Sequence, residues 1–154
     1  MKRVWAMVLA LTALSCATGA CAQTRGALVQ YAPADEYFGP LQMSILGIRN
    51  QLHDLGKQYD FKPENVDAIL GKAVMAEASL RDWESRYPTD PALPRYVYWL
   101  THLYQKINHA LARRKSVETE SWLLTRYGSS SFGKDELTTL MDRNVRVQSA
   151  TIIP

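Results

Sequence analysis

The sequence predicts an all-α protein built from antiparallel helical hairpins, either tetratricopeptide-like or a small helical bundle. Three observations support this fold class. Apolar residues recur every three or four positions in three long stretches, which places them along one side of a helix. Prolines stand near the start of each stretch, where a missing backbone N–H is tolerated. The connections between the stretches are short, so neighbouring helices are expected to run antiparallel.

Residues 1–22 have the layout of an export signal. Lys2 and Arg3 precede an uncharged run that is too short to span a bilayer, and Ala20-Cys21-Ala22 fits the pattern of a signal-peptidase site. The sequence therefore predicts cleavage after Ala22 and a periplasmic or secreted protein. No later stretch is long and apolar enough to predict a transmembrane segment.

Cys21 leaves a second interpretation open, because lipidation at this residue would give an outer-membrane lipoprotein. The residues before it, Thr18-Gly19-Ala20, fit a lipidation signal less well than the cleavage site fits its pattern.

Removal of Lys2 and Arg3 with the signal lowers the formal net charge from +3 to +1, so the main argument for binding nucleic acid disappears. The processed chain would also hold no cysteine, and its stability must come from apolar packing.

Residues 23–39 show no periodicity and are interpreted as an extended lead-in to a helical domain over residues 40–130. The first helix is expected from Pro40 to Tyr59. Its apolar stripe consists of Tyr37, Leu41, Ile45, Ile48, Leu52, Leu55 and Tyr59. The second helix is expected to start near Pro63 and to end before Pro88, with a stripe of Val66, Ile69, Leu70, Ala73, Ala76, Leu80, Trp83 and Tyr87.

The third helix is expected to follow Thr89-Asp90-Pro91, with Tyr96, Leu100, Leu103, Tyr104, Ile107 and Leu111 on its stripe. Beyond Leu111 the pattern changes phase, which leaves three arrangements open: a kink near residues 113–116, a separate helix over 116–127, or one long helix. Gly128 ends the helical run in each of them. Residues 131–154 are expected to hold a short helix, from Lys134 to Arg143, and a loose C-terminal tail.

The second and the last of these helical stretches end alike. Trp83-Glu84-Ser85-Arg86-Tyr87-Pro88 parallels Leu123-Leu124-Thr125-Arg126-Tyr127-Gly128. Together with Ala76 and Leu80, this ending resembles the second helix of a tetratricopeptide-type repeat, and the chain is similar to a degenerate member of that family. The Trp-Leu-Gly-Tyr pattern of the first repeat helix is missing. The resemblance implies a scaffold that binds proteins or peptides and is not an enzyme.

One side of the predicted third helix, opposite its apolar stripe, is rich in hydrogen-bonding and aromatic groups. It consists of Tyr98, His102, Gln105, His109 and Arg113. Such a surface is typical of contact with a partner, although a solvated helix face is the simpler interpretation. His102 and His109 are seven residues apart, and helical metal ligands are usually four apart, so no metal site is expected.

Nucleophilic and phosphate chemistry lack their usual motifs, since neither a G-x-S-x-G elbow nor a glycine-rich phosphate loop occurs, and no cofactor is expected. Glu77 is the one acid that borders a stripe; we expect its carboxylate to reach water at the helix edge. The sequence therefore favours an exported, non-enzymatic binding or scaffold module of the cell envelope. The alternatives are a structural or assembly-related lipoprotein acylated at Cys21 and a small hydrolase that uses Glu77.

Overall fold

The computed structural model describes residues 28–151, with side chains as far as Arg146. In this part of the chain the helices are α1 (Ile45–Phe61), α2 (Val66–Arg86), α3 (Leu93–Lys106), α4 (Ala110–Tyr127) and α5 (Ser131–Thr151). A two-residue antiparallel strand pair, β1 (Tyr37–Phe38) and β2 (Met43–Ser44), precedes α1. A 3-10 helix, Pro63–Asn65, joins α1 to α2. The predicted all-α fold class is confirmed.

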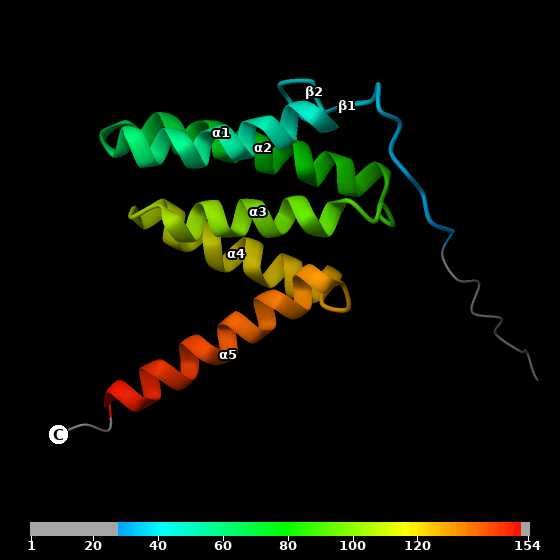
Figure 1. Ribbon diagram of the computed structural model, residues 1–154. Helices are drawn as coiled ribbons and strands as arrows, with labels where there is room; N and C mark the ends of the chain where they lie inside the picture. Colours follow the sequence, from blue (N-terminus) through cyan, green and yellow to red (C-terminus); the bar gives the residue numbers. More distant parts are fainter. Residues whose placement is uncertain (1–27, 152–154) are drawn as a thin grey trace, which may run out of the picture.

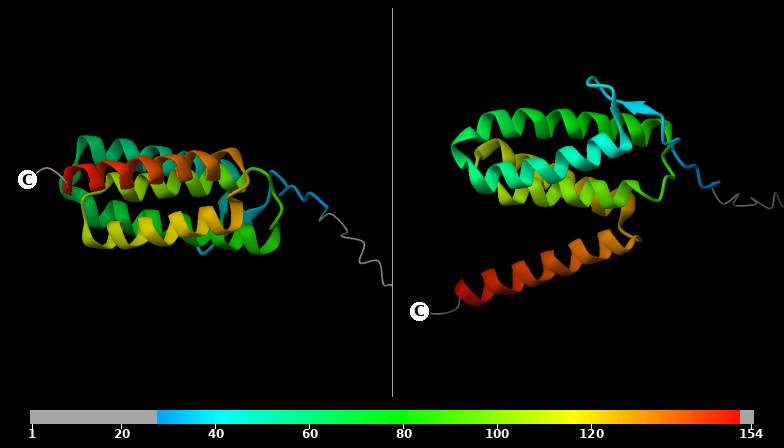
Figure 2. Two further views of the ribbon diagram at one scale, coloured as in Figure 1. Left: turned by 90° about the horizontal axis from the view of Figure 1, so that it is seen from below. Right: turned by 45° about the horizontal axis from the view of Figure 1, so that its top comes forward.

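The first four helices form two stacked hairpins, α1–α2 and α3–α4, in which successive helices run in opposite directions (Figure 1). The two hairpins meet through α3, which packs against α1 and α2 as well as against α4. The last helix, α5, packs on α3 and α4. Its far end diverges from the other helices, as Figure 1 and the right view of Figure 2 show.

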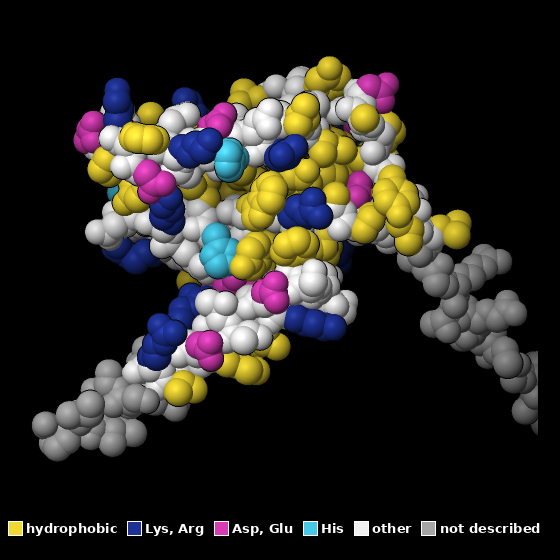
Figure 3. Space-filling model, in the orientation of Figure 1, with side chains coloured by type: hydrophobic (Ala, Val, Ile, Leu, Met, Phe, Trp, Pro, Cys, Tyr) yellow, Lys and Arg dark blue, Asp and Glu magenta, His cyan; other side chains and the backbone are white. Residues whose placement is uncertain are grey.

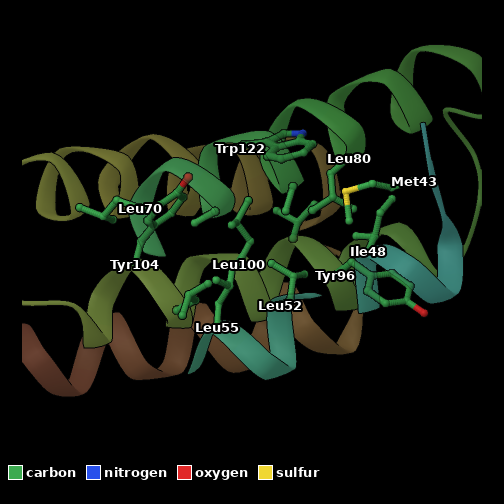
Figure 4. Packing of buried hydrophobic residues seen from close by; sticks show 14 of the residues in the cluster. Met43, Ile48, Leu52, Leu55, Leu70, Leu80, Tyr96, Leu100, Tyr104 and Trp122 are labelled. Carbon is green, nitrogen blue, oxygen red and sulfur yellow. The ribbon is translucent and has the colours of Figure 1, made fainter. Parts of the chain in front are cut away.

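The apolar stripes predicted for the first three helices meet in one core. Side chains from α1, α2 and α3 surround Leu100, and Leu52, Leu55, Leu70 and Leu80 lie close to it (Figure 4). Trp83 and Tyr104 are the largest side chains that are fully buried. Because no cysteine lies among the described residues, this apolar contact between the hairpins is what holds them together.

The first helix begins at Ile45, later than the predicted start at Pro40. The intervening residues form the turn of the β1–β2 hairpin, in which Gly39 and Gln42 have positive φ angles of 69° and 48°. Tyr37 and Leu41 are consequently exposed and do not extend the stripe. The helix starts at Ile45 because the Ser44 hydroxyl accepts a hydrogen bond from the backbone N–H of Gly47, at 3.1 Å.

The chain before β1 is attached to the start of the second hairpin by side chains of the 89–90 turn. The Asp90 carboxylate is buried and accepts hydrogen bonds from the Ala32 backbone N–H (2.8 Å) and the Trp83 indole N–H (3.1 Å). The Thr89 hydroxyl donates to the carbonyl of Leu28 and accepts from the N–H of Gln30. These contacts give residues 28–32 a defined path without regular secondary structure.

The two helix endings that resemble each other in sequence also make similar contacts. At the end of α2, Arg86 forms an ion pair with Glu36, and the Tyr87 hydroxyl donates to the same carboxylate. At the end of α4, both Arg126 and Tyr127 donate to the carboxylate of Glu84, at 3.1 and 2.8 Å. In each case an Arg-Tyr pair binds the carboxylate of an acid from an earlier part of the chain. The repeated sequence therefore corresponds to a repeated interaction.

The break between the third and fourth helices lies at Ile107–His109, earlier than the predicted region near residues 113–116, so the expectation of a kink there or of one long helix is wrong. No glycine or proline marks the break. Instead, the His109 Nδ1 atom caps α4 by accepting from the N–H of Leu111 at 3.2 Å. The backbone N–H of Asn108 donates to the Tyr59 hydroxyl of α1 at 3.0 Å. These two contacts satisfy backbone groups that the break leaves outside a helix.

The last helix is longer than predicted. It runs from Ser131 to Thr151, where the sequence suggested a short helix and a loose tail. The Ser130 hydroxyl accepts from the N–H of Gly133 at 3.0 Å, and this contact defines its start. Residues 1–22, including Cys21 and the predicted cleavage site, lie outside the described residues.

Candidate functional site

The partner surface predicted on the third helix is divided by the structure. Tyr98, His102 and Gln105 belong to α3 and lie on its side that faces α5. The Tyr98 ring packs on His102, with 4.2 Å between ring centroids, and on Phe132 of α5, with 5.5 Å. Three of the five predicted residues are therefore partly covered by a helix of the same chain.

A fully buried acid of α5, Glu136, organises these contacts. Its Oε1 atom accepts hydrogen bonds from the Gln105 amide at 3.0 Å and from Arg143 at 2.9 Å. Its Oε2 atom lies 3.1 Å from Nε2 of His102. Gln105 also donates to Glu120 of α4, which Arg143 contacts as well. We call Glu136, His102, Gln105 and Arg143 the Glu136 cluster. Sequence reasoning missed it, because nothing in the local pattern predicted that α5 covers α3.

His109 and Arg113 do not extend this surface, because the helix break separates them from it. His109 is the N-cap of α4, and Arg113 lies in the first turns of that helix, where it donates to the Asn108 side chain at 3.1 Å. The expectation that all five residues share one face of a continuous helix is therefore wrong. The change of helix axis after Lys106 removes the periodicity on which that expectation depended.

A groove of about 360 Å³ lies between α1 and α3, beside the Glu136 cluster. Its floor is apolar and consists of Leu52, Leu103 and the ring of Trp99, which is 37% exposed. His102 lines the groove on one side. In the space-filling view, hydrophobic side chains occupy the surface between two histidines, one on each of these helices (Figure 3). Trp122 of α4, by contrast, is buried.

The rim of this groove carries two lysines and one acid, Asp60, so its formal charge is +1. Lys57 and Lys106 both line it. The Lys106 ammonium group binds Asp60 at 2.6 Å and the Gly56 carbonyl at 3.2 Å, and so ties α3 to α1. Lys57 makes no ion pair within residues 28–146 and remains available. An apolar floor with a basic edge suits an apolar side chain that has an acidic neighbour.

A larger hollow of about 700 Å³ lies where α1 turns into α2. Six of its nine lining residues are polar or charged, and they include Lys62, Asn65 and Lys72. Phe61, the one aromatic residue there, is almost fully exposed and points away from any core. Pockets that bind ligands or partner side chains are mostly apolar with a few polar groups, so the smaller α1–α3 groove is the better candidate.

Glu77, on which the hydrolase alternative depends, is 7% exposed, so the expectation that its carboxylate reaches water is wrong. The carboxylate accepts a hydrogen bond from the Tyr104 hydroxyl at 3.1 Å and lies 3.4 Å from Lys115 and 3.6 Å from Arg81. Burial and this carboxylate raise the pKa of Tyr104. Glu77 thus connects α2 to α3 and α4, and it does not line the α1–α3 groove or the larger hollow.

Among the described side chains, no three His, Cys, Asp or Glu residues gather in a way that could hold a metal ion. None of the helices over residues 28–151 is both long and apolar enough to cross a bilayer.

Comparison of the chain with protein-family models, with curated proteins and with solved structures gave no match.

Proposed function

We propose that this protein is an exported, non-enzymatic binding module of the cell envelope, which holds a protein or peptide partner in the groove between α1 and α3. The observation that carries the proposal is the partly exposed Trp99 on an apolar groove floor, next to His102 and beneath a basic rim. Partly exposed aromatic rings in apolar depressions are the usual anchors of protein interfaces.

The chemistry of the groove defines the segment that fits it. A large apolar side chain would cover Trp99 and Leu103, and an acidic residue beside it would pair with Lys57. The groove follows the direction of two helices, which suits an amphipathic helix or an extended peptide. His102 is the member of the predicted partner surface that takes part, whereas Tyr98 and Gln105 act through their contacts with α5.

A hairpin-repeat architecture of the tetratricopeptide type agrees with this function. Its support is the shared ending of α2 and α4, in which Arg86-Tyr87 and Arg126-Tyr127 hold Glu36 and Glu84 in the same way. Proteins built from such hairpins bind other proteins along grooves between helices.

Site-specific photo-crosslinking tests the proposed groove. Benzoylphenylalanine replaces Trp99 in one variant and Met75 of α2, which is 38% exposed and does not line the groove, in the other. Irradiation of cells that export the chain should give a discrete protein adduct from position 99 and none from position 75. Equal adducts from both positions, or none from position 99, would contradict the proposal.

We also propose that the chain reaches the envelope through cleavage after Ala22. Mass spectrometry of the processed protein should give an N-terminus at Gln23. A lipid-modified Cys21 at the N-terminus would show that the protein is an outer-membrane lipoprotein, which would change its location and leave the groove proposal to be decided by the crosslinking.

A further inference from the structure

The hollow where α1 turns into α2 collects lysines that no acid neutralises. The described residues contain six lysines, of which Lys106 and Lys115 are held in ion pairs. The other four make no ion pair within this part of the chain: Lys57, Lys62, Lys72 and Lys134. Three of these four line the hollow of about 700 Å³. Unpaired charges of one sign around a concave surface raise its potential and attract ions of the opposite sign.

The acids of this turn leave the hollow positive. Asp54 is the one acid that lines it, so the formal charge of its lining is +2. Asp60 is held by Lys106 at 2.6 Å, on the side of the α1–α3 groove. Glu64 and Asp67 belong to the same turn, but neither lines the hollow. An anion that enters the hollow therefore meets three ammonium groups and one carboxylate.

Phe61 adds an apolar group to this basic surface. It is the last residue of α1, lines the hollow and is 83% exposed. The hollow lies at the end of the α1–α2 hairpin opposite to the β1–β2 strands (Figure 1). The Phe61 ring can thus cover an apolar part of a ligand whose anionic part lies among the lysines.

We propose that this hollow binds a ligand that carries phosphate groups, with the phosphates beside Lys57, Lys62 and Lys72 and an apolar part against Phe61. Ammonium groups bind phosphate as point charges. The volume lies in the range of ligand sites, about 300–1,000 Å³. The polar lining that makes the hollow a poor site for an apolar side chain suits an anion. The headgroup of an anionic phospholipid and a soluble phosphorylated molecule share this chemistry.

The test removes two of the three charges. Lys62→Gln and Lys72→Gln are combined, because neither ammonium group has a partner that the fold would lose. Lys57 stays unchanged, since it also lines the α1–α3 groove, so the outcome here is independent of the groove proposal. The matched control combines Arg49→Gln and Lys134→Gln, which remove the same charge from exposed positions outside the hollow.

Two probes distinguish the sources of phosphate. Vesicles of phosphatidylglycerol and phosphatidylcholine represent a lipid headgroup, with vesicles of phosphatidylcholine alone as reference, and inorganic pyrophosphate represents a soluble ligand. Sedimentation measures vesicle binding, and titration calorimetry measures pyrophosphate binding. Any lipid on the N-terminus is common to all variants, so it does not affect their comparison.

A tryptophan reporter locates the lipid. Phosphatidylglycerol with brominated acyl chains should quench the added indole of Phe61→Trp and spare that of Val117→Trp, at a residue of α4 that is 66% exposed and does not line the hollow. Quenching at position 61 identifies a phospholipid as the ligand. Binding of pyrophosphate without this quenching identifies a soluble phosphate compound.

For at least one probe, the Lys62→Gln, Lys72→Gln protein should bind about tenfold or more weakly than the wild type. The Arg49→Gln, Lys134→Gln protein should bind nearly as the wild type does. Equal weakening in both proteins would show that net charge alone attracts the probe. That result, or failure of the wild type to bind either probe, overturns the proposal.

Discussion

Nε2 of His102 and Oε2 of Glu136 lie 3.1 Å apart, and within the described part of the chain neither buried atom has a hydrogen-bond partner elsewhere. A hydrogen on Nε2 of the neutral imidazole would satisfy both atoms, which would otherwise be two buried acceptors that face each other. The pair joins α3 to α5 across 34 residues of sequence, beside the contact of Phe132 with Tyr98.

The first prediction concerns this acid. Glu136→Leu leaves His102, Gln105 and Arg143 without their common acceptor, so α5 should detach from the bundle. We expect the free energy of unfolding to fall by about 1–3 kcal/mol. Hydrogen–deuterium exchange should show loss of protection in α5 while the amides of α2 keep theirs.

Asp135→Leu is the control, because it makes the same chemical change at an exposed neighbour. It should leave the exchange rates of α5 close to those of the wild type. Glu136→Gln, which keeps one acceptor for Gln105, should fall between the wild type and Glu136→Leu. Full protection of α5 in Glu136→Leu would mean that Phe132 alone holds the helix.

The second prediction concerns the turn before α1. In Gly39→Ala the new β-carbon would lie 2.4 Å from the Ser79 Oγ atom and 2.7 Å from the Ser79 α-carbon, at a φ angle of 69°. The turn must then move away from α2, which also breaks the hydrogen bond from the Gly39 N–H to Asp82. We expect a loss of about 2–4 kcal/mol in urea denaturation.

Gly56→Ala provides the comparison, because a β-carbon at that position in α1 meets nothing within 4 Å. Alanine should stabilise the helix there by about 0.5–1 kcal/mol. Equal stabilities of the two alanine variants would show that the β1–β2 turn does not need its close approach to α2.

The third prediction is a pH dependence that arises at Glu84. Burial raises the pKa of this carboxyl, but hydrogen bonds from Trp122, Tyr127 and Arg126 outweigh it and hold the pKa below its ordinary value. The unfolded chain therefore binds this proton more readily than the folded one. The stabilisation is complete above the ordinary carboxyl pKa and is lost as the pH falls through the lowered pKa of the folded state.

Urea denaturation at a series of pH values below 5 measures this contribution. Glu84→Gln should be less stable than the wild type at neutral pH and should lose less of its stability as the pH falls. Glu64→Gln, a change at an exposed acid of the 3-10 helix, should follow the wild-type curve. Identical pH dependence in Glu84→Gln and the wild type would rule out Glu84 as the source.

The core was the part of the fold that the sequence predicted best. Periodic burial needs only local information, and Ile48, Leu70 and Leu100 all lie inside as their spacing indicates. The start of α1 was harder to predict, because Pro40 is compatible with two local structures. It suits the first turn of a helix, and it also suits the β1–β2 hairpin turn, in which Gly39 has a positive φ angle. Local preference was ambiguous there, and the packing of the turn on α2 decided the outcome.

The candidate site was harder still, since its parts come together only in three dimensions. The pattern assigned Tyr98 and His102 to one side of α3, but it could not reveal that Phe132 and Glu136 cover that side or that Tyr98 also packs against the core. The groove that Trp99 lines likewise depends on how α1 and α3 are spaced. Charge and hydropathy patterns describe one helix at a time, whereas these features belong to pairs of helices.

The last prediction concerns the break between α3 and α4, where the chain turns without glycine or proline. His109→Ala removes the side-chain acceptor for the Leu111 N–H, so the first turn of α4 should loosen and the free energy of unfolding should fall by about 1 kcal/mol. His109→Asn supplies another capping oxygen and should retain most of the wild-type stability. His53→Ala, at an exposed histidine of α1, should change stability little. An unchanged free energy of unfolding in His109→Ala would contradict the assignment of the cap. Because the Tyr59 hydroxyl accepts from the Asn108 N–H independently, the break should persist in all three variants, and a continuous helix through residues 93–127 in His109→Ala would contradict this role of the Tyr59 contact.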